Sequence, residues 1–372
     1  MILLYFVDNL SNSGGIQRML VNKINYLADN PLYTIHIVCF QKCDSFFKIN
    51  PNISLHNLGI ESMDSFFAKV SNLISLIRKT KHLLDVIQPD VVINENMRTI
   101  SFVLPFIKKT IPKINVIHFS HTGQVIMDTL LYKNRLHRFL IRSLRLFIFR
   151  KYERFIVLTE FDQLKWALPN VQIIPNFTNV EPTVTPSLLS RKVVFIGRFE
   201  HQKDVLILIN AWSIVSKSAP DWTLELYGSG SEEDIIRSRI EGLGLEDSVI
   251  LKGLTSDMHQ VYQNASLLVN SSIYEGFVLV VLEALTVGIP CISFDIPGCN
   301  NMIQDNVNGF LVKERTSDDL ARKILYYINL PYEHKKNIQN RIPDTIAKYS
   351  RQCVMKQWMD LFDELIQKNT KK

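Results

Sequence analysis

The chain of 372 residues carries 42 Lys and Arg against 36 Asp and Glu, which gives a formal net charge of +6. Apolar residues make up 47% of it and charged residues 21%, so it can build packed cores, and global disorder is excluded. Its 14 Gly and 14 Pro exclude collagen-like and low-complexity chains, and the length favours two domains over one.

The first half alternates short apolar runs with helical stretches. Residues 2–7 are predicted to form a strand buried on both faces, followed by a glycine-containing loop and a helix over 16–28. Further strands are expected at 34–40, 90–94, 113–118, 154–158 and 171–174, with a long helix over 65–87. Strands that alternate with helices in this way are typical of a parallel, doubly wound sheet.

Residues 175–190 have the composition of a linker, and the alternating pattern begins again after them. Strands are expected at 191–197, 223–227, 248–251, 265–270, 290–294 and 309–312, and helices at 318–329 and 350–367. The last helix is expected to follow a turn around Pro343.

The predicted fold class is α/β, with two Rossmann-like, doubly wound domains that face each other across a cleft. Such an arrangement suits a ligand held at the carboxyl ends of two sheets. The expected division is a first Rossmann-like domain over 1–180, a second Rossmann-like domain over 190–345, and a C-terminal helical segment over 346–372 that crosses back toward the first domain.

The cysteines and apolar runs indicate a cytoplasmic protein. No Cys/His quartet surrounds the five scattered cysteines, so neither a disulfide framework nor a structural zinc site is expected. They are Cys39, Cys43, Cys291, Cys299 and Cys353. The apolar start of the chain lacks a basic leader, and no apolar stretch reaches the roughly 18–20 residues of a spanning helix. We therefore expect reduced thiols and no spanning segment.

Two glutamates follow a buried run at 267–270. Glu275 lies in the loop that follows it, and Glu283 lies eight residues later, about two turns into a helix that ends at Gly288. Glu283 stands among apolar residues, where a charge needs a partner. Two such carboxylates can accept hydrogen bonds from different hydroxyls of one extended polar ligand. The alternative is that Glu283 is a solvated helix residue.

Arg198 and Lys203 lie in a loop between the strand over 191–197 and a helix that begins near Asp204. Such a loop brings backbone N–H groups and a positive helix end together, which forms an anion site. An arginine and a lysine there predict a diphosphate site. As isolated residues, both would be ordinary surface charges.

Gly14 and Gly15 follow the first strand and precede a helix, in the sequence Ser13-Gly-Gly-Ile-Gln-Arg18. Two glycines let the backbone approach a ligand closely, and the following helix directs its N-terminus at it. The spacing is not Gly-x-Gly-x-x-Gly, so the dinucleotide fingerprint is absent. A plain glycine turn is the alternative.

These groups of residues occur in an order that resembles glycosyltransferase family 4, the retaining, nucleotide-sugar-dependent enzymes of GT-B fold. The resemblance is carried by Gly14-Gly15, Gly197-Arg198 with Lys203-Asp204, Glu275 with Glu283, and the stretches 270–276 and 306–312. It is most specific over 190–312. In the first half it is limited to the glycine loop and the surroundings of His118.

The resemblance implies a donor site. Arg198 and Lys203 would hold the donor diphosphate and stabilise the charge that builds on the leaving group. Glu275 would contact the donor sugar or the leaving group, and Glu283 would bind the ribose hydroxyls. One loop would help to bind phosphate through its backbone: Gly276, Phe277, Val278 and Leu279.

The resemblance also implies contributions from the first domain. Gly14 and Gly15 would approach the diphosphate from the opposite side. His118 matches the family's active-site histidine near the anomeric centre, with His121 as a rival, and either could instead be an ordinary loop residue. The implied catalytic residues are therefore His118, Arg198, Lys203 and Glu275. Neither a metal nor another cofactor is expected, because cations and N–H groups can stabilise the leaving group and no Asp-x-Asp triplet is present.

Residues 133–154 hold eight basic residues against one acid, Glu153. Four of the basic residues step by three, four and three along one stripe of a helix: Arg135, Arg138, Arg142 and Arg145. A basic amphipathic helix is typical of docking on an anionic membrane surface. The alternative is a helix face that packs on its own domain. No nucleic-acid-binding motif accompanies the charge, so nucleic acid is not an expected partner.

The sequence thus predicts a retaining, metal-independent hexosyltransferase, located in the cytoplasm and peripherally on the inner face of the cell membrane. It would move a sugar from a UDP-linked donor to a lipid-linked or glycan acceptor in bacterial surface-polysaccharide synthesis: capsule, O-antigen or exopolysaccharide. Two alternatives stay open, a nucleotide-sugar epimerase of GT-B fold and a non-catalytic module that binds nucleotide sugars.

Overall fold

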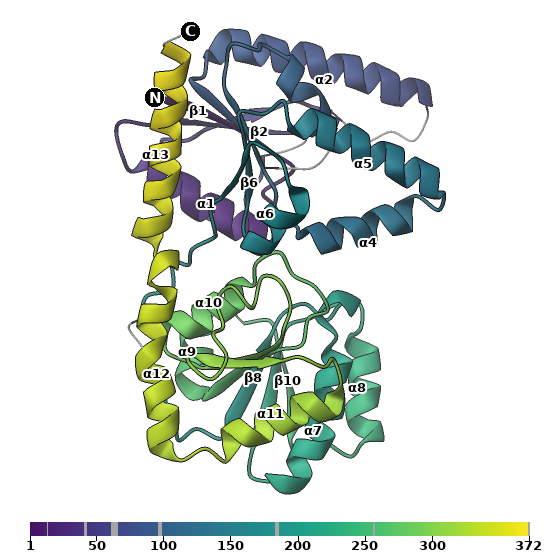
Figure 1. Cartoon of the computed structure of the whole chain (residues 1–372), viewed down its shortest axis with the longest axis vertical. Helices are drawn as coiled ribbons and strands as arrows, with labels where there is room; N and C mark the ends of the chain where they lie inside the picture. Colours follow the sequence, from purple (N-terminus) through teal and green to yellow (C-terminus); the bar gives the residue numbers. More distant parts are fainter. Residues whose placement is uncertain are drawn as a thin grey trace. The chain divides into compact units, whose positions relative to one another are not determined.

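The computed structural model describes residues 1–12, 14–40, 43–60, 66–95, 99–182, 186–255 and 257–370. Contacts divide the chain into two compact units, one made of Met1–Asn176 with Arg351–Lys372 and one made of Phe177–Ser350 (Figure 1). Ser13 of the glycine motif and residues 183–185 of the expected linker lie outside the described residues.

The first unit contains a seven-stranded parallel sheet in the order β3-β2-β1-β4-β5-β6-β7. Its strands are β1 Ile2–Val7, β2 Thr34–Cys39, β3 Ser54–Asn57, β4 Val91–Asn94, β5 Lys113–Val116, β6 Arg154–Val157 and β7 Val171–Ile173. The sequence does not predict β3, because this short edge strand is polar and mostly exposed.

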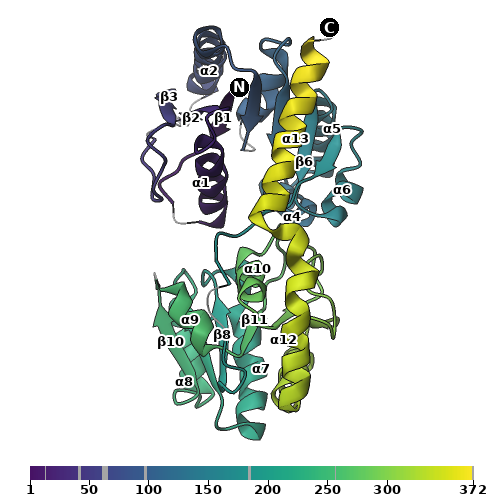
Figure 2. The same cartoon turned by 90° about the vertical axis from the view of Figure 1, so that its left-hand side faces the viewer.

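Helices cover both faces of this sheet (Figures 1 and 2). They are α1 Gly15–Ala28, α2 Phe66–Ile87, α3 Thr99–Val103, α4 His121–Leu131, α5 Arg135–Phe149, α6 Glu160–Trp166 and α13 Arg351–Thr370, with a 3₁₀ turn at Leu104–Phe106. Leu4 and Phe6 of β1 share a core with Phe149 of α5, whereas the alternate residue Tyr5 lies next to Lys23 of α1. Burial on both faces explains the unbroken apolar run of β1.

The second unit contains a six-stranded parallel sheet in the order β10-β9-β8-β11-β12-β13. Its strands are β8 Lys192–Ile196, β9 Thr223–Tyr227, β10 Val249–Gly253, β11 Leu267–Asn270, β12 Cys291–Phe294 and β13 Gly309–Val312. Its helices are α7 Val205–Ser218, α8 Glu233–Gly242, α9 Met258–Asn264, α10 Leu279–Thr286, α11 Ser317–Ile328 and α12 Tyr332–Ile346.

The turn predicted around Pro343 is wrong, because Pro343 lies inside α12. A proline inside a helix costs about 3 kcal/mol or more. Ile338, Ile342 and Ile346 are buried at intervals of four residues on the same helix. Their packing outweighs the local penalty.

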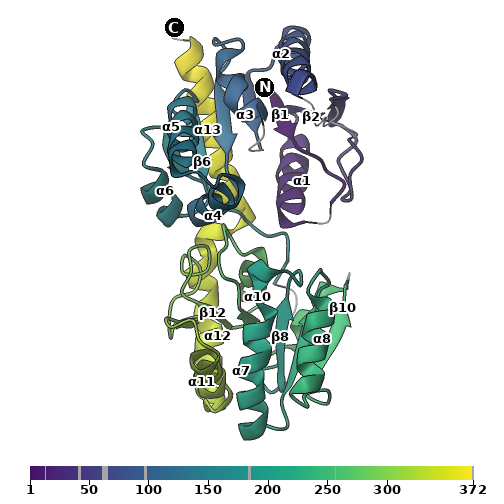
Figure 3. The same ribbon diagram turned by 90° about the vertical axis from the view of Figure 1, so that its right-hand side faces the viewer.

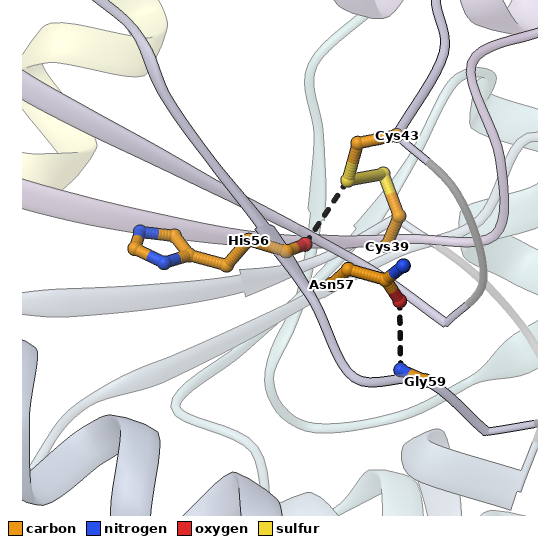
Figure 4. Close-up of a disulfide and its surroundings, with 5 residues drawn as sticks. All are labelled: Cys39, Cys43, His56, Asn57 and Gly59. Carbon is orange, nitrogen blue, oxygen red and sulfur yellow. Dashed lines mark hydrogen bonds between the residues drawn. A yellow bond between two sulfur atoms is a disulfide. The ribbon is translucent and has the colours of Figure 1, made fainter.

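The prediction that all five cysteines are reduced is also wrong, because Cys39 and Cys43 form a disulfide (Figure 4). Their Cα atoms are 5.5 Å apart, a separation that a disulfide can bridge. Cys43 Sγ lies 3.0 Å from the carbonyl oxygen of His56 on the neighbouring strand β3. Cys291 and Cys299 are free and buried, and Cys353 is free and exposed.

Candidate active site

The second sheet has a reversal point between β8 and β11, which are parallel neighbours although three strands apart in sequence. The connections leave such a point toward opposite faces of the sheet and open a crevice at the carboxyl ends of the strands, where ligands bind. The loop after β8 carries Arg198 and Lys203, and the loop after β11 carries Glu275.

Lys203 and Glu275 meet at this crevice. Lys203 Nζ lies 2.5 Å from Glu275 Oε1, and the Ser272 hydroxyl donates a hydrogen bond to the same oxygen at 2.7 Å. The side chains of Lys203 and Glu275 are 16% and 10% exposed. A largely buried carboxylate thus has two donors, as its burial requires.

Further hydrogen bonds join the two loops. The Ser271 hydroxyl donates to the Lys203 carbonyl oxygen at 2.8 Å, and the Ile273 N–H donates to the Gln202 carbonyl oxygen at 2.8 Å. The Gln202 side chain returns a bond to the Tyr274 carbonyl oxygen at 2.9 Å. These bonds fix the position of Lys203 relative to Glu275.

Arg198 is exposed and lies at the beginning of the same β8 loop. The loop ends at Asp204, which has a φ of 44° and caps α7 by accepting a hydrogen bond from the Ile207 N–H at 3.3 Å. The N-terminus of this helix therefore lies next to Lys203. A cationic side chain beside a helix N-terminus favours an anion.

Arg315, which follows β13, is a residue that the sequence analysis missed. Its guanidinium donates to the carbonyl oxygens of Ser271 and Ser272, both at 2.9 Å, and to Asp204 Oδ2 at 2.6 Å. It also lies over the Phe294 ring, 4.5 Å from its centroid. Arg315 thus joins the loops after β8 and β11. A lone arginine in a polar loop gives no signal of this in the sequence.

Gly298 lets the chain pass close to the Glu275 loop. Its φ is +89°, and a side chain there would place a Cβ 2.9 Å from the Gly276 carbonyl oxygen and 3.1 Å from that of Glu275. Only glycine accepts both this backbone conformation and this contact.

Glu283 lies in the second turn of α10 and is 2% exposed, so a solvated side chain is excluded. The Tyr262 hydroxyl of α9 donates to its Oε2 at 2.9 Å. The loop over Gly276–Val278 leads into α10, whose first turn has no side-chain cap. The Val281 N–H donates to the Val278 carbonyl oxygen, and the backbone N–H groups that precede it in this turn can receive an anion.

In the first unit, Gly14 is the N-cap of α1 and Gly15 is its first residue. A Cβ on Gly14 would lie 2.8 Å from the Gln17 side-chain oxygen, so a larger residue would require Gln17 to move.

His118 follows β5, and its Nε2 lies 2.6 Å from Glu95 Oε2, within hydrogen-bond distance. Lys23 of α1 forms an ion pair with the other oxygen of Glu95. The sequence analysis named neither partner. The rival His121 begins α4, with its backbone N–H bound to Asp162 and its ring edge-on to Trp166, and burial is the main cause that lowers its pKa.

The prediction that Arg145 shares an exposed basic stripe is wrong. Arg145 is buried and forms two hydrogen bonds of 2.8 Å with Asp128 of α4. Burial of Asp128 opposes ionisation, but the hydrogen bonds and charge of Arg145 outweigh it, so the pKa of Asp128 is lowered. Arg135 and Arg142 are exposed and Arg138 is half-buried.

No group of three or more His, Cys, Asp or Glu side chains that could hold a metal ion occurs among the described residues. In the same ranges, no helix combines the length and the apolar character needed to cross a bilayer.

The two Rossmann-like domains, each built on a parallel sheet, give the chain the GT-B fold. Residues 187–344 match the model of the family "Glycosyl transferases group 1", which covers most of the second unit. The chain is a glycosyltransferase.

Relatives and solved structures agree with this class. An uncharacterized glycosyltransferase of Haemophilus influenzae is 26% identical over 88% of this chain and 90% of the relative. The poly(ribitol-phosphate) alpha-N-acetylglucosaminyltransferase of Staphylococcus aureus is 30% identical over 68% of this chain, but the match covers 51% of that relative.

Two solved structures share the fold along nearly the whole chain. The apo form of the lipopolysaccharide outer core galactosyltransferase WaaB has a TM-score of 0.75 at 20% identity and covers 98% of this chain and 100% of that chain. Anabaena HepE in complex with UDP-glucose has a TM-score of 0.77 at 17% identity and the same coverage. The chain is therefore related to bacterial enzymes of surface-polysaccharide synthesis.

Proposed function

We propose that the protein is a retaining hexosyltransferase of glycosyltransferase family 4, which transfers a sugar from a UDP-linked donor to a lipid-linked or glycan acceptor of a bacterial surface polysaccharide. The observation that carries the proposal is the contact between Lys203 and Glu275 at the reversal point of the second sheet. The name of the Staphylococcus relative and the UDP-glucose bound to HepE support a nucleotide-sugar donor.

The donor diphosphate binds at the loop after β8. Negative charge builds on the leaving nucleoside diphosphate as the bond from the anomeric carbon to the phosphate oxygen breaks. Charged groups that are already in place stabilise it without reorganisation. Lys203 is held by Glu275, and Arg198 is exposed on the same loop. The backbone N–H groups at Gly276, Phe277, Val278 and Leu279 add donors from the start of α10.

Glu275 contacts the donor sugar and Glu283 accepts hydrogen bonds from the ribose hydroxyls. Tyr262 supports this assignment because its hydroxyl holds the Glu283 carboxylate in one orientation. Gly14 and Gly15 supply a stretch of backbone without side chains for the diphosphate, and His118 acts near the anomeric centre.

The proposed activity is tested by incubating the protein with UDP-glucose, UDP-galactose, UDP-N-acetylglucosamine and GDP-mannose. The readouts are the shift in melting temperature and the release of nucleoside diphosphate. We expect one donor to raise the melting temperature because it binds the folded state alone. Slow release of UDP without acceptor excludes a non-catalytic module. Conversion of the donor to an epimer would replace the transferase proposal with the epimerase.

Two finer points need their own measurements. An NMR spectrum of the product glycoside should show the same anomeric configuration as the donor, which tests retention. Activity should be unchanged after dialysis against EDTA, and loss that added Mg²⁺ or Mn²⁺ restores would contradict metal independence.

We also propose that α4 and α5 dock the protein on an anionic membrane surface (Figures 1 and 3). Among the described residues, large exposed apolar side chains gather there: Phe119, Val125, Met127, Leu130, Leu131, Leu136, Phe139, Leu140, Leu144 and Phe147. An exposed apolar patch of this kind marks an interaction surface.

The charges beside the patch favour lipid as the partner. Lys133, Arg135 and Arg142 are exposed on or next to α5, so a basic rim accompanies an apolar face. This combination fits a helix that lies in the plane of an anionic bilayer surface. Sedimentation with anionic vesicles should exceed that with neutral vesicles, and equal negligible binding to both would end the proposal.

A further inference from the structure

A buried network surrounds His118 at the reversal point of the first sheet, between β1 and β4. Glu95 directly follows β4, His118 follows β5, and Lys23 comes from the middle of α1. Glu95 accepts from Lys23 Nζ with one oxygen and from His118 Nε2 with the other. The exposed fractions of the side chains are 5% for Lys23, 1% for Glu95 and 7% for His118.

Glu95 is ionised in this network. Burial acts to raise its pKa, but the charge of Lys23 and the hydrogen bond from His118 outweigh burial and lower the pKa to about 2. An ionised carboxylate can only accept hydrogen bonds. The hydrogen of the bond between Glu95 and His118 therefore belongs to Nε2 of the imidazole.

The other ring nitrogen of His118 has no partner. Nδ1 is buried and makes no hydrogen bond to any residue that the structure describes. A second hydrogen there would place a charged donor in a buried site without an acceptor, which is costly. His118 also lines a cavity of about 10 Å³, room for one water molecule, together with Asn176 and Trp358.

Lys23 balances the charge of Glu95. Its ammonium lies over the Trp358 ring of α13, 4.1 Å from the centroid, and 5.5 Å from the Tyr5 ring centroid. The ionisable groups of the network thus come from β1, α1 and the ends of β4 and β5.

We propose that Lys23 and Glu95 are positioning residues that hold His118 as the neutral Nε2–H tautomer and present Nδ1 as a hydrogen-bond acceptor. Which nitrogen carries the hydrogen is set by the bond that the ring makes to its neighbour. The inference rests on the proposed function in one respect, namely that Nδ1 accepts a hydrogen bond from a hydroxyl group of the substrate. The tautomer itself depends only on the network.

The test is the ¹⁵N spectrum of histidine-labelled protein, with the His118 signals assigned by their loss in His118→Gln. We expect wild type to show a hydrogen on Nε2 and a bare Nδ1. In Lys23→Met/Glu95→Met both charges leave together, which keeps the fold better than removal of one partner. Its His118 signals should become those of a mixture of tautomers.

Kinetics with the active UDP-sugar provide the second readout. We expect kcat to fall about 10–100-fold in the double variant while KM for the donor changes little. A loss of activity of this size is usual when the hydrogen-bond partner that fixes the tautomer and orientation of a metal-binding histidine is removed, and we expect the same for His118. A Glu95→Gln variant should retain more of the Nε2–H tautomer and a higher kcat than the double variant, because the glutamine carbonyl oxygen can still accept a hydrogen bond from Nε2. The matched control is Lys192→Met/Glu225→Met, which removes an ion pair of the second unit.

A hydrogen on Nδ1 in wild type overturns the inference, whether or not the double variant folds. So does a folded double variant with an unchanged tautomer and unchanged kcat. If no UDP-sugar is turned over while the tautomer shifts as expected, the proposed function fails and the network assignment stands. If His118→Gln is as active as wild type, His118 loses its catalytic assignment.

Discussion

The two sheets each place a lysine and a glutamate at the point where the strand order reverses, and the two pairs differ in exposure. Lys23–Glu95 in the first unit is almost completely buried, with side chains 5% and 1% exposed. Lys203–Glu275 in the second unit is 16% and 10% exposed. In both pairs the partners are 72 residues apart in the sequence.

The difference assigns different tasks to the same pair of residue types. A pair that water cannot reach must stay together, because loss of one partner leaves an uncompensated buried charge. Lys203 is less completely buried and lies in a loop, so its ammonium can exchange Glu275 for a phosphate group. On this basis we propose that the first pair orients His118 and that the second holds Lys203 in place for a ligand.

The largest effect is expected from breaking the buried pair on one side. Lys23→Met should lower the free energy of unfolding by about 3–5 kcal/mol, because Glu95 keeps its charge without a cation. Lys203→Met should cost much less, because Glu275 is more exposed and retains the Ser272 hydroxyl. Urea denaturation followed by circular dichroism compares them, and equal losses would contradict the contrast between the pairs.

The Lys23–Glu95 pair should also make the free energy of unfolding depend on pH in the acid range. The pKa of Glu95 is about 2 in the folded protein, against an ordinary value of 4.5 that stands for the unfolded chain, so its stabilising contribution is present above pH 4.5 and is lost as the pH falls toward 2. Between these limits, wild type should lose about 3 kcal/mol more stability than Lys23→Met/Glu95→Met. Denaturation curves at pH 5, 4 and 3 should show about 2 kcal/mol of this difference, and parallel losses would refute it.

The Lys203–Glu275 pair is expected to affect activity more than stability. A lost hydrogen bond to a charged phosphate costs about 1.5–3 kcal/mol, so Lys203→Ala or Arg198→Ala should lower kcat/KM roughly ten- to a hundredfold. Steady-state release of UDP measures it. Lys252→Ala, at an exposed position of β10, is the matched control. Unchanged kinetics in both variants would remove the diphosphate assignment.

The smallest effect is expected on the proposed binding to an anionic membrane surface. Each basic group near an anionic bilayer contributes about 1 kcal/mol, so Arg142→Gln should weaken vesicle binding about fivefold, and more salt should reduce the difference. Arg145→Gln is unsuitable for this purpose because Arg145 is bound to Asp128 inside the unit. If Arg142→Gln binds vesicles as tightly as wild type does, the basic residues beside the apolar patch do not contribute to membrane binding through Arg142.

Much of the fold could be predicted because parallel strands that are buried on both faces have nearly continuous apolar sequences. The expected bounds of β9 and β13 are those of the structure, and the repeated alternation of strands and helices is reflected in two parallel sheets. Local signals failed where tertiary packing decides. Pro343 stays in α12 because three isoleucines pack beside it, and β3 has no apolar pattern because it is an edge strand.

The candidate site was predictable where its residues are grouped along the chain. The loops after β8 and β11 carry their own motifs, so Arg198, Lys203 and Glu275 stand out in the sequence. Glu95 and Lys23 do not stand out, because each is a single charged residue in the sequence and only the fold brings both of them close to His118. The same reason hid Arg315, and it placed Arg145 inside the unit although its spacing follows a surface stripe.

The return of α13 to the first unit has a consequence for biosynthesis. Trp358, which covers the ammonium of Lys23, leaves the ribosome only after all of Phe177–Ser350. At about 5–20 residues per second, the first unit waits roughly 10–35 s for its last helix. During that interval the nascent N-terminal half is incomplete, and chaperones that bind unfinished chains have their longest opportunity there.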